Sequence, residues 1–139
     1  MTKIECITKD GSIETFQYES EKQICLGRND WIFRVHPIGG KVFDFFEFSV
    51  TQIDENIGKV TMMSHNSQPE LIAKGIPERM IEEAYKILEL EIISSTTSAN
   101  HKILENEYIT ESAVKVWKRL VKRGNAYFDS ENKVYRYKP

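Results

Sequence analysis

The sequence predicts one α+β domain built on a mixed, mostly antiparallel sheet with two main helices. Short strand-like runs separated by turn residues fill the first half of the chain, two amphipathic helical patterns lie in the second half, and a hairpin pattern closes it. The chain has 139 residues, enough for one domain with its own core, and no repeat or linker divides it. We therefore expect a single domain over residues 1–139.

Composition and charge exclude several classes of protein. A formal net charge of −2 and a pI of about 6.0 disfavour a general nucleic-acid binder. Cys6 and Cys25 form no metal-ligand or redox motif, so we expect reduced, buried thiols and no metal site. No apolar run reaches the roughly 18 to 20 residues that a membrane span needs, and no leader pattern is found. We expect a cytoplasmic protein with no membrane contact.

Alternating apolar and polar residues predict the strands of the first half. Asp10-Gly11 is typical of a tight hairpin turn, and the residues at 19–22 predict a polar break. The strands are expected at residues 4–8, 13–18, 23–26, 31–36, 41–52 and 57–63. The run at 41–52 contains Phe43, Phe45, Phe46 and Phe48, which predicts either a central strand covered on both sides or a bulge that changes the alternation.

The clearest element is the helix after Gly75. One face of it is apolar and the other is mostly charged; the apolar face carries Met80, Ile81, Ala84, Tyr85 and Leu88. Gly75 allows a backbone conformation closed to other residues, and Pro77 suits the first turn, where its missing N–H has no partner inside the helix. Such a start can present backbone N–H groups to an anion, and it also occurs in helices that bind nothing.

The second half continues with a short strand, a second helix and a hairpin. The strand at 91–94 follows a crossover helix and is expected to lie parallel to the strand at 57–63. Thr110 is the expected N-cap of the second helix, and Gly124 follows its end. Its apolar stripe is Ala113, Val114, Trp117, Leu120 and Val121; its basic stripe is Lys115, Lys118, Arg119, Lys122 and Arg123. The basic stripe is either a solvated face or a contact for phosphates or an acidic partner.

These elements and residues resemble the acyl-CoA N-acyltransferase (GNAT) superfamily over roughly residues 40–139. The stretch 72–77, Ile-Ala-Lys-Gly-Ile-Pro, occupies the position of the family's loop Q/R-x-x-G-x-G/A before a helix. The stretch 112–120, followed by Gly124, looks like the family's later helix. The resemblance implies acetyl-CoA as cofactor. It assigns the strand end Met62, Met63 and Ser64 to the pantetheine arm, and Lys74, Gly75 and Ile76 to the pyrophosphate.

Three residues depart from the family's pattern. Ile72 replaces the usual Gln or Arg, and Pro77 replaces a small residue and removes an N–H donor from the phosphate loop. Trp117 stands where the family commonly has a tyrosine that protonates the leaving thiolate. The candidate replacements for a catalytic acid or base are His65, Glu47 and Tyr108, and the sequence does not place them in one cleft.

Two functions of different classes follow from these observations. The first is an acyl-CoA-dependent N-acetyltransferase, in which a small-molecule or peptide amine attacks the thioester directly, because neither cysteine has an activating base nearby. The alternative is a non-catalytic GNAT-like domain that binds another ligand or a protein partner. The polar run 94–98 is interpreted as a groove rim or a flexible loop, and residues 102–108 predict no element. A homodimer through an edge strand remains open.

Overall fold

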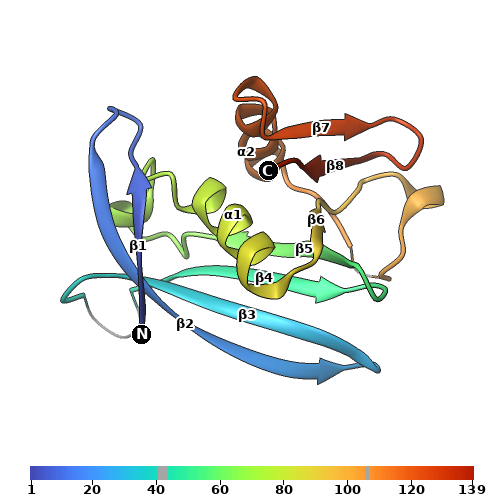
Figure 1. Ribbon diagram of the computed structural model, residues 1–139, viewed down its shortest axis with the longest axis horizontal. Coiled ribbons are helices and arrows are strands. Elements are labelled where there is room, and N and C mark those ends of the chain that lie inside the picture. The colour runs from blue at the N-terminus through green and yellow to red at the C-terminus, as the bar shows by residue number, and fades with distance from the viewer. Residues whose placement is uncertain (41–43, 106) are drawn as a thin grey trace.

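The protein consists of one eight-stranded sheet and two helices, in the part of the chain that the computed structural model describes: residues 1–40, 44–105 and 107–139 (Figure 1). The strand order across the sheet is β1-β2-β3-β4-β5-β6-β8-β7. The elements are β1 (Thr2–Ile7), β2 (Ile13–Cys25), β3 (Arg28–Pro37), β4 (Phe46–Gln52), β5 (Ile57–Ser64), α1 (Ile76–Leu88), β6 (Glu91–Ile93), α2 (Glu111–Lys122), β7 (Ala126–Asp129) and β8 (Val134–Tyr137), with one-turn 3-10 helices at Pro69–Leu71 and Ala99–His101.

Among the described strands, one neighbouring pair, β5 and β6, is parallel, and the other neighbours are antiparallel. The predicted α+β class and the predicted parallel pair are therefore confirmed. The helix α1 connects the two parallel strands, as the chain order required.

The first four strands follow each other along the chain and across the sheet. The turn at Asp10-Gly11 joins β1 to β2 as expected. The predicted polar break at 19–22 is wrong, because β2 runs on to Cys25. Its polar half pairs with β3 from Glu19↔Arg34 to Cys25↔Arg28, and this pairing satisfies the backbone while the side chains face water.

Two other predictions about these strands need correction. The β2–β3 turn is Leu26-Gly27, with both residues at positive φ as in a two-residue type I′ hairpin, so β3 begins at Arg28 instead of residue 31. The predicted strand at 41–52 begins only at Phe46. Its first part, including Phe43, lies outside the described residues.

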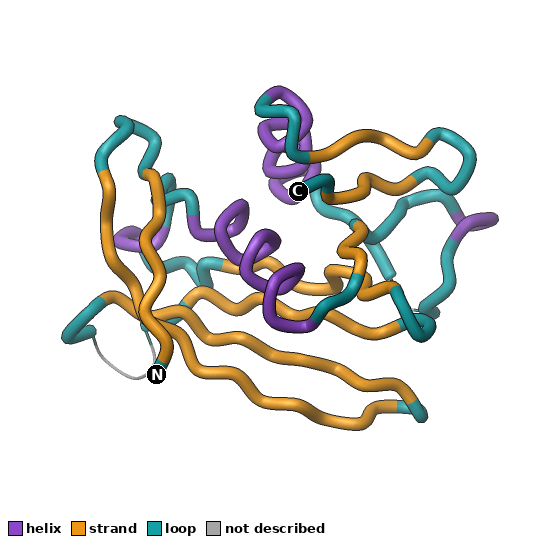
Figure 2. The backbone as a smooth tube through the Cα atoms, in the orientation of Figure 1, coloured by secondary structure: helices purple, strands orange, loops and turns teal. Residues whose placement is uncertain are grey.

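Both helices cover the same face of the sheet. On β8, Tyr135 stacks against Trp117 of α2, and Tyr137 packs against Tyr85 of α1. Residues two positions apart in a strand point to the same side, so α1 and α2 lie on one face and the opposite face of β2–β5 is left to loops. Figure 2 shows the strongly twisted sheet, with α1 lying between the β1–β3 side and the β7–β8 side.

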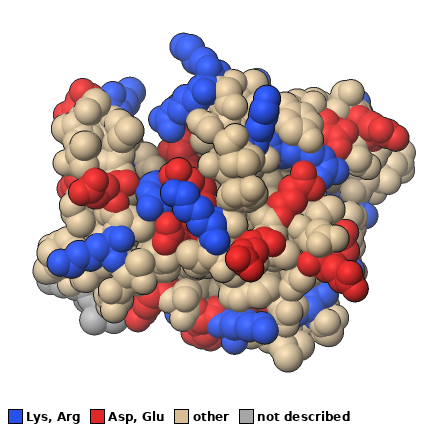
Figure 3. Space-filling view, in the orientation of Figure 1, with Lys and Arg blue, Asp and Glu red and all other residues tan. Residues whose placement is uncertain are grey.

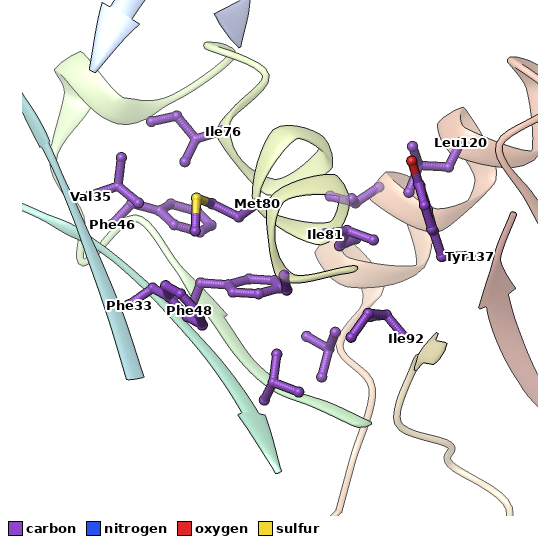
Figure 4. Packing of buried hydrophobic residues seen from close by; sticks show 14 of the residues in the cluster. Phe33, Val35, Phe46, Phe48, Ile76, Met80, Ile81, Ile92, Leu120 and Tyr137 are labelled. Carbon is purple, nitrogen blue, oxygen red and sulfur yellow. The ribbon is translucent and has the colours of Figure 1, made fainter. Parts of the chain in front are cut away.

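The core lies between this helical face and the sheet. Phe33, Phe48 and Val35 are fully buried on the strands, and Met80 and Ile81 are fully buried on α1 (Figure 4). Each large apolar side chain removed from water in this way contributes about 1.5–3 kcal/mol. Trp31 packs against this core on the same face of β3 as Phe33 and Val35.

The polar faces of the two helices differ from the prediction. On α1 the charged face was expected in water, but two of its carboxylates, Glu78 and Glu83, are buried. Glu83 accepts hydrogen bonds from the Tyr18 hydroxyl at 2.6 Å and from Arg79 at 2.9 Å, and burial together with this carboxylate raises the pKa of Tyr18 to about 12. On α2, Val116 is buried in place of Val121, which is 40% exposed.

The cysteines are both unpaired, as expected, but they differ in exposure. Cys6 lies on the core face of β1 and is buried. Cys25 ends β2 beside the hairpin turn and is exposed, so the prediction of two buried thiols is wrong for this residue.

Candidate functional site

The two parallel strands separate soon after they begin. The strands β5 and β6 are paired at three positions, Ile57↔Glu91, Gly58↔Ile92 and Lys59↔Ile93. After these pairs β6 ends, while β5 continues to Ser64. On its other side β5 pairs with β4, where Val50 opposes Val60 and Ser49 opposes Met62, so Thr61 is an extra residue on β5. Such a β-bulge bends its strand and increases the local twist. The bulge therefore lies where β5 turns away from β6.

Buried polar contacts fix the segment that follows β6 against its neighbouring strands. Ser95, which follows β6, donates a hydrogen bond from its Oγ to the carbonyl oxygen of Val60 at 2.7 Å. Ser94 accepts a hydrogen bond from the N–H of Tyr135 on β8 at 2.9 Å. Both serines and Thr96 are buried. The first residues of the run 94–98 are therefore buried and hydrogen-bonded to β5 and β8, unlike a flexible polar loop.

A cavity of about 160 Å³ lies between the second half of β5 and the start of α2, with Ser95 at its border. Thr61, Met62 and Met63 form one wall, and Trp117 of α2 forms part of the other. Tyr108, 63% exposed, and Ser95 contribute hydroxyl groups to the lining. The indole Nε1–H of Trp117 is buried and has no hydrogen-bond partner among the described residues.

The loop before α1 depends on Gly75. Its φ of +73° is in the left-handed region, and a Cβ built there would lie 2.1 Å from the carbonyl oxygen of Ile7 on β1. A glycine is thus required both by the backbone angle and by the close approach of another strand. The neighbouring Ala73 carbonyl accepts a hydrogen bond from the N–H of Lys9 at 2.9 Å, which ties the loop to the β1–β2 turn.

A second cavity, of about 270 Å³, opens at the start of α1. It shares Met63 and Ala113 with the first cavity, so the two are adjacent. Its lining carries the side chains of His65, Lys74 and Lys115 together with Gly75. We call the two cavities together the strand–helix groove.

Charged residues meet at this end of α1. Glu78, in the first turn, is 4% exposed, and its Oε1 accepts hydrogen bonds from Nε and Nη2 of Arg119 at 2.7 and 2.6 Å. Lys74 pairs with Glu14 of β2 at 2.9 Å. The helix dipole stabilises a carboxylate in the first helical turn. Glu78 therefore already neutralises part of the positive potential that would attract an external anion to this helix start.

Four of the six predicted site residues line this groove, and Ser64 and Ile76 do not. Met62 lines the first cavity, Met63 lines both, and Lys74 and Gly75 line the second. Ser64 is half-buried and its hydroxyl is engaged with Asn66. The Ile76 side chain is fully buried in the core, so only its backbone can face a ligand.

Other lining residues were missing from the predicted set. Ala113, Ser95 and Arg119 reach the groove from elements far from Gly75 in the chain. Glu78 had a sequence signal, because an acidic residue in a first helical turn faces the helix start. Ser95 belongs to the run 94–98, for which a groove rim was one interpretation, and Arg119 belongs to the basic stripe, for which phosphate contact was one interpretation. Ala113 had no such signal, since its place in the groove depends on how α2 packs.

A buried ion pair lies beside the strand separation. Lys59 of β5 and Glu107 are 1% and 0% exposed, with Nζ and Oε2 2.7 Å apart. Glu107 also accepts hydrogen bonds from the N–H groups of Thr96, Ile103 and Leu104. Burial acts to raise the pKa of Glu107, but the bonds from Lys59 and the two N–H groups of Ile103 and Leu104 outweigh it and hold that pKa below its usual value. The pair anchors the segment between β6 and α2 onto β5.

Within residues 1–40, 44–105 and 107–139, no group of three or more His, Cys, Asp or Glu side chains is arranged to hold a metal ion. No described helix combines the length and apolar character needed to cross a membrane.

Fold and site together define a small α+β protein with a ligand-sized groove where two parallel strands separate and a helix begins. Comparisons with protein-family models, with curated proteins and with solved structures gave no match.

Proposed function

We propose that the protein is an N-acyltransferase of the GNAT type that binds acetyl-CoA in the strand–helix groove and acetylates an amine. The observation that carries the proposal is the separation of β5 and β6 at the Thr61 bulge, directly beside a groove that continues to the Gly75 start of α1. Separated strands leave backbone groups free to hydrogen-bond an extended ligand, and the helix start suits its phosphates.

The groove offers matching chemistry along its length. The pantetheine arm would lie along β5 past Met62 and Met63, with the thioester in the smaller cavity. The pyrophosphate would lie in the larger cavity, near the backbone of Gly75 and the side chains of Lys74 and Lys115. Basic side chains gather around α2 in the upper part of Figure 3, and these would favour approach of a polyanionic cofactor.

The proposed reaction is direct transfer. The amine nitrogen forms a bond to the thioester carbonyl carbon, and the carbon–sulfur bond breaks. CoA leaves as a thiol with a proton from an enzyme donor, and the proton that the amine nitrogen loses restores that donor. Burial raises the pKa of the Cys6 thiol to about 12, so this cysteine is a poor nucleophile and does not support a covalent acyl-enzyme. Tyr108 is the groove hydroxyl that we assign as proton donor to the leaving sulfur, since the Ser95 hydroxyl is already bonded to Val60.

A specific observation favours a second candidate, a non-catalytic domain of the same architecture. Glu78 and its partner Arg119 stand at the start of α1, and Pro77 supplies no N–H there. A carboxylate at this position opposes a pyrophosphate by like-charge repulsion. A domain of this kind would use the groove for a ligand with fewer negative charges.

Thermal unfolding with increasing acetyl-CoA tests binding. A ligand present at a hundred times its dissociation constant adds about 2.7 kcal/mol of stability, which raises the melting temperature measurably. Lys115→Gln removes a cation from the groove and is expected to weaken binding several-fold. Lys118→Gln, one helical turn further and exposed, is the matched control that should leave binding unchanged.

Turnover separates the two candidates. Release of CoA thiol in the presence of a panel of amines supports the transferase, and loss of that release in Tyr108→Phe supports the assigned proton donor. Stabilisation without thiol release favours the non-catalytic domain. Absence of any shift at millimolar acetyl-CoA rejects the transferase.

A further inference from the structure

The strand β1 forms one edge of the sheet, and part of that edge is open. Among the described strands, β1 has β2 as its one neighbour. The N–H of Thr8 donates to the carbonyl oxygen of Ser12 at 2.8 Å, and this bond fixes which pairs along β1 and β2 are hydrogen-bonded, because bonded pairs alternate in an antiparallel ladder. By this alternation the N–H and C=O groups of Lys3 and Glu5 point away from β2.

The loop before α1 closes the far end of this edge. Gly75 lies directly against the carbonyl oxygen of Ile7, and the Ala73 carbonyl accepts a hydrogen bond from the N–H of Lys9. Lys3 and Glu5 come before this contact, and both have exposed side chains. The open stretch of β1 is therefore the part of the strand that precedes Ile7.

Two adjoining cavities lie alongside β1. The first, of about 210 Å³, is lined by Glu5 of β1, Leu120 of α2 and Tyr137 of β8. The second, of about 410 Å³, is bordered by the β1–β2 turn and by α2. Ile7 and Arg123 line both. We call the two cavities together the β1–α2 cleft, and Figure 3 shows the surface hollowed between the β1–β2 hairpin and α2.

The cleft keeps an excess of positive charge after its ion pairs are counted. Its charged lining residues are the cations Lys9, Arg79, Arg119 and Arg123 and the acids Glu5, Glu78 and Glu82. Arg119 pairs with Glu78 at 2.6 Å, and Arg79 approaches Glu82 at 3.6 Å. Lys9 and Arg123 form no ion pair within the described part of the chain, so two free cations remain against the one carboxylate of Glu5.

We propose that the β1–α2 cleft binds an extended acidic peptide, which adds as a strand to the open edge of β1 and pairs a carboxylate with Arg123. The backbone groups of Lys3 and Glu5 would bond the main chain of the peptide, as an exposed strand edge does when it captures a partner. Leu120 and Tyr137 form an apolar wall for its side chains. The cation excess favours an acidic peptide over a neutral or basic one. This docking site goes beyond the proposed acyl transfer and does not depend on it.

The probe is the heptapeptide TVTVTDD with both ends blocked, and TVTVTNN is its neutral counterpart. Threonine and valine favour an extended backbone. Titration calorimetry on the full chain is expected to show binding of the acidic peptide at sub-millimolar concentration. The neutral peptide should bind about tenfold more weakly, because it lacks the charge-assisted bond to Arg123.

N-methylated peptides test strand addition itself. The N–H groups of an extended chain point alternately to its two sides, so methylation of every second amide removes the donors of one side and leaves the other intact. One methylated set should abolish measurable binding, while the complementary set should bind like the parent peptide. Equal affinity of the two sets overturns strand addition, and this comparison needs no change in the protein.

Two pairs of variants locate the site on the protein. Arg123→Gln should weaken the acidic peptide about tenfold and leave the neutral peptide unchanged. Lys122→Gln removes the neighbouring exposed cation, which lines neither cavity, and should change neither affinity.

The second pair is on β1. Glu5→Pro removes an outward N–H at a position where an edge strand accepts proline, and it should weaken both peptides although it also removes a negative charge. Glu5→Gln keeps the N–H and should bind the acidic peptide at least as tightly as the wild type. Far-UV circular dichroism checks that the Glu5→Pro variant is folded.

The outcomes separate this inference from the proposed function. Equal affinity for the acidic and neutral peptides, no peptide binding at millimolar concentration, or an Arg123→Gln variant that binds as tightly as the wild type overturns the docking site. A dimer in sedimentation velocity that the peptide does not dissociate means that a second copy covers the edge, and it also overturns the site. Peptide binding without stabilisation by acetyl-CoA leaves the docking site standing and rejects the transferase; the reverse result rejects the docking site alone.

Discussion

At the residue scale, the pair formed by Lys59 and Glu107 is the most consequential contact beside the groove. Both side chains are buried, and Glu107 accepts four hydrogen bonds that gather Thr96, Ile103 and Leu104 around it. Removing one partner of a buried pair leaves an uncompensated charge, which is far more costly than removing both.

Glu107→Gln is expected to lower the free energy of unfolding by about 3 to 5 kcal/mol at pH 7, as measured by urea denaturation. The folded pKa of Glu107 is lowered, so its contribution to stability is complete above the usual value of 4.5 and is lost as the pH falls through the folded pKa. The difference between wild type and variant should therefore shrink in acid below that value.

A double variant tests whether Lys59 and Glu107 stabilise the fold as a pair. Lys59→Met with Glu107→Leu removes both charges and should be less destabilised than Glu107→Gln alone. A double variant as unstable as the sum of the two single variants would contradict the pairing.

Glu78 is the residue at which stability and ligand binding are expected to oppose each other. Glu78→Gln removes the charge that pairs with Arg119 at the start of α1, which should cost about 1 to 2 kcal/mol of stability in urea denaturation. The same change removes like-charge repulsion and frees Arg119, so the affinity for acetyl-CoA should rise several-fold in calorimetry. An affinity that falls in this variant would show that Glu78 does not oppose the phosphates.

At the scale of elements, the start of α1 depends on one glycine. Gly75→Ala is expected to lower the free energy of unfolding by about 3 kcal/mol or more, since the added Cβ lies 2.1 Å from the Ile7 carbonyl oxygen at a positive φ. Denaturant unfolding with far-UV circular dichroism measures this loss.

Gly124, after α2, is the matched control for this prediction. Its φ is +81°, but no heavy atom lies within 4 Å of an added Cβ. Gly124→Ala should thus lower the free energy of unfolding by about 1 kcal/mol, the strain of placing an alanine at positive φ. Equal losses in the two variants would mean that the contact with β1 has no energetic weight.

At the scale of the whole molecule, the sheet runs without interruption from β1 to β7, and the two tryptophans report on different parts of it. Trp31 is on β3, and Trp117 packs under β8. Trp31→Phe and Trp117→Phe leave one reporter each. We expect both variants to show a single unfolding transition whose fluorescence and circular dichroism midpoints coincide, as for one cooperative domain. Separate midpoints within one variant would show that the two parts unfold independently.

Much of the architecture was predictable because local patterns and burial agree. Met80, Ile81 and Ala84 have helical spacing and are all buried; Phe33 and Val35 alternate on one face of a strand. The parallel partnership of β5 and β6 followed from the helix between them. The polar half of β2 was missed, because its strand state comes from pairing with β3 and not from its own side chains.

The candidate site was predictable only in part. Gly75 and Lys74 stand next to each other in a recognisable loop, and Met63 ends a clear strand, so local sequence indicated them. Tyr108 and Arg119 were named from the sequence as a candidate acid and as part of the basic stripe, but only the packing of α2 against the strand ends brings them to the groove.

The sequence by itself determined the number and kind of most elements and the position where a glycine must begin α1, because these depend on propensities and periodicities within a few residues. The tertiary structure alone decided that β5 bulges at Thr61, that Glu78 and Glu107 are buried with cationic partners, and that two adjacent cavities form the strand–helix groove. Those features arise from contacts between residues far apart in the chain, whose free energies depend on distance and on exclusion of water rather than on local order.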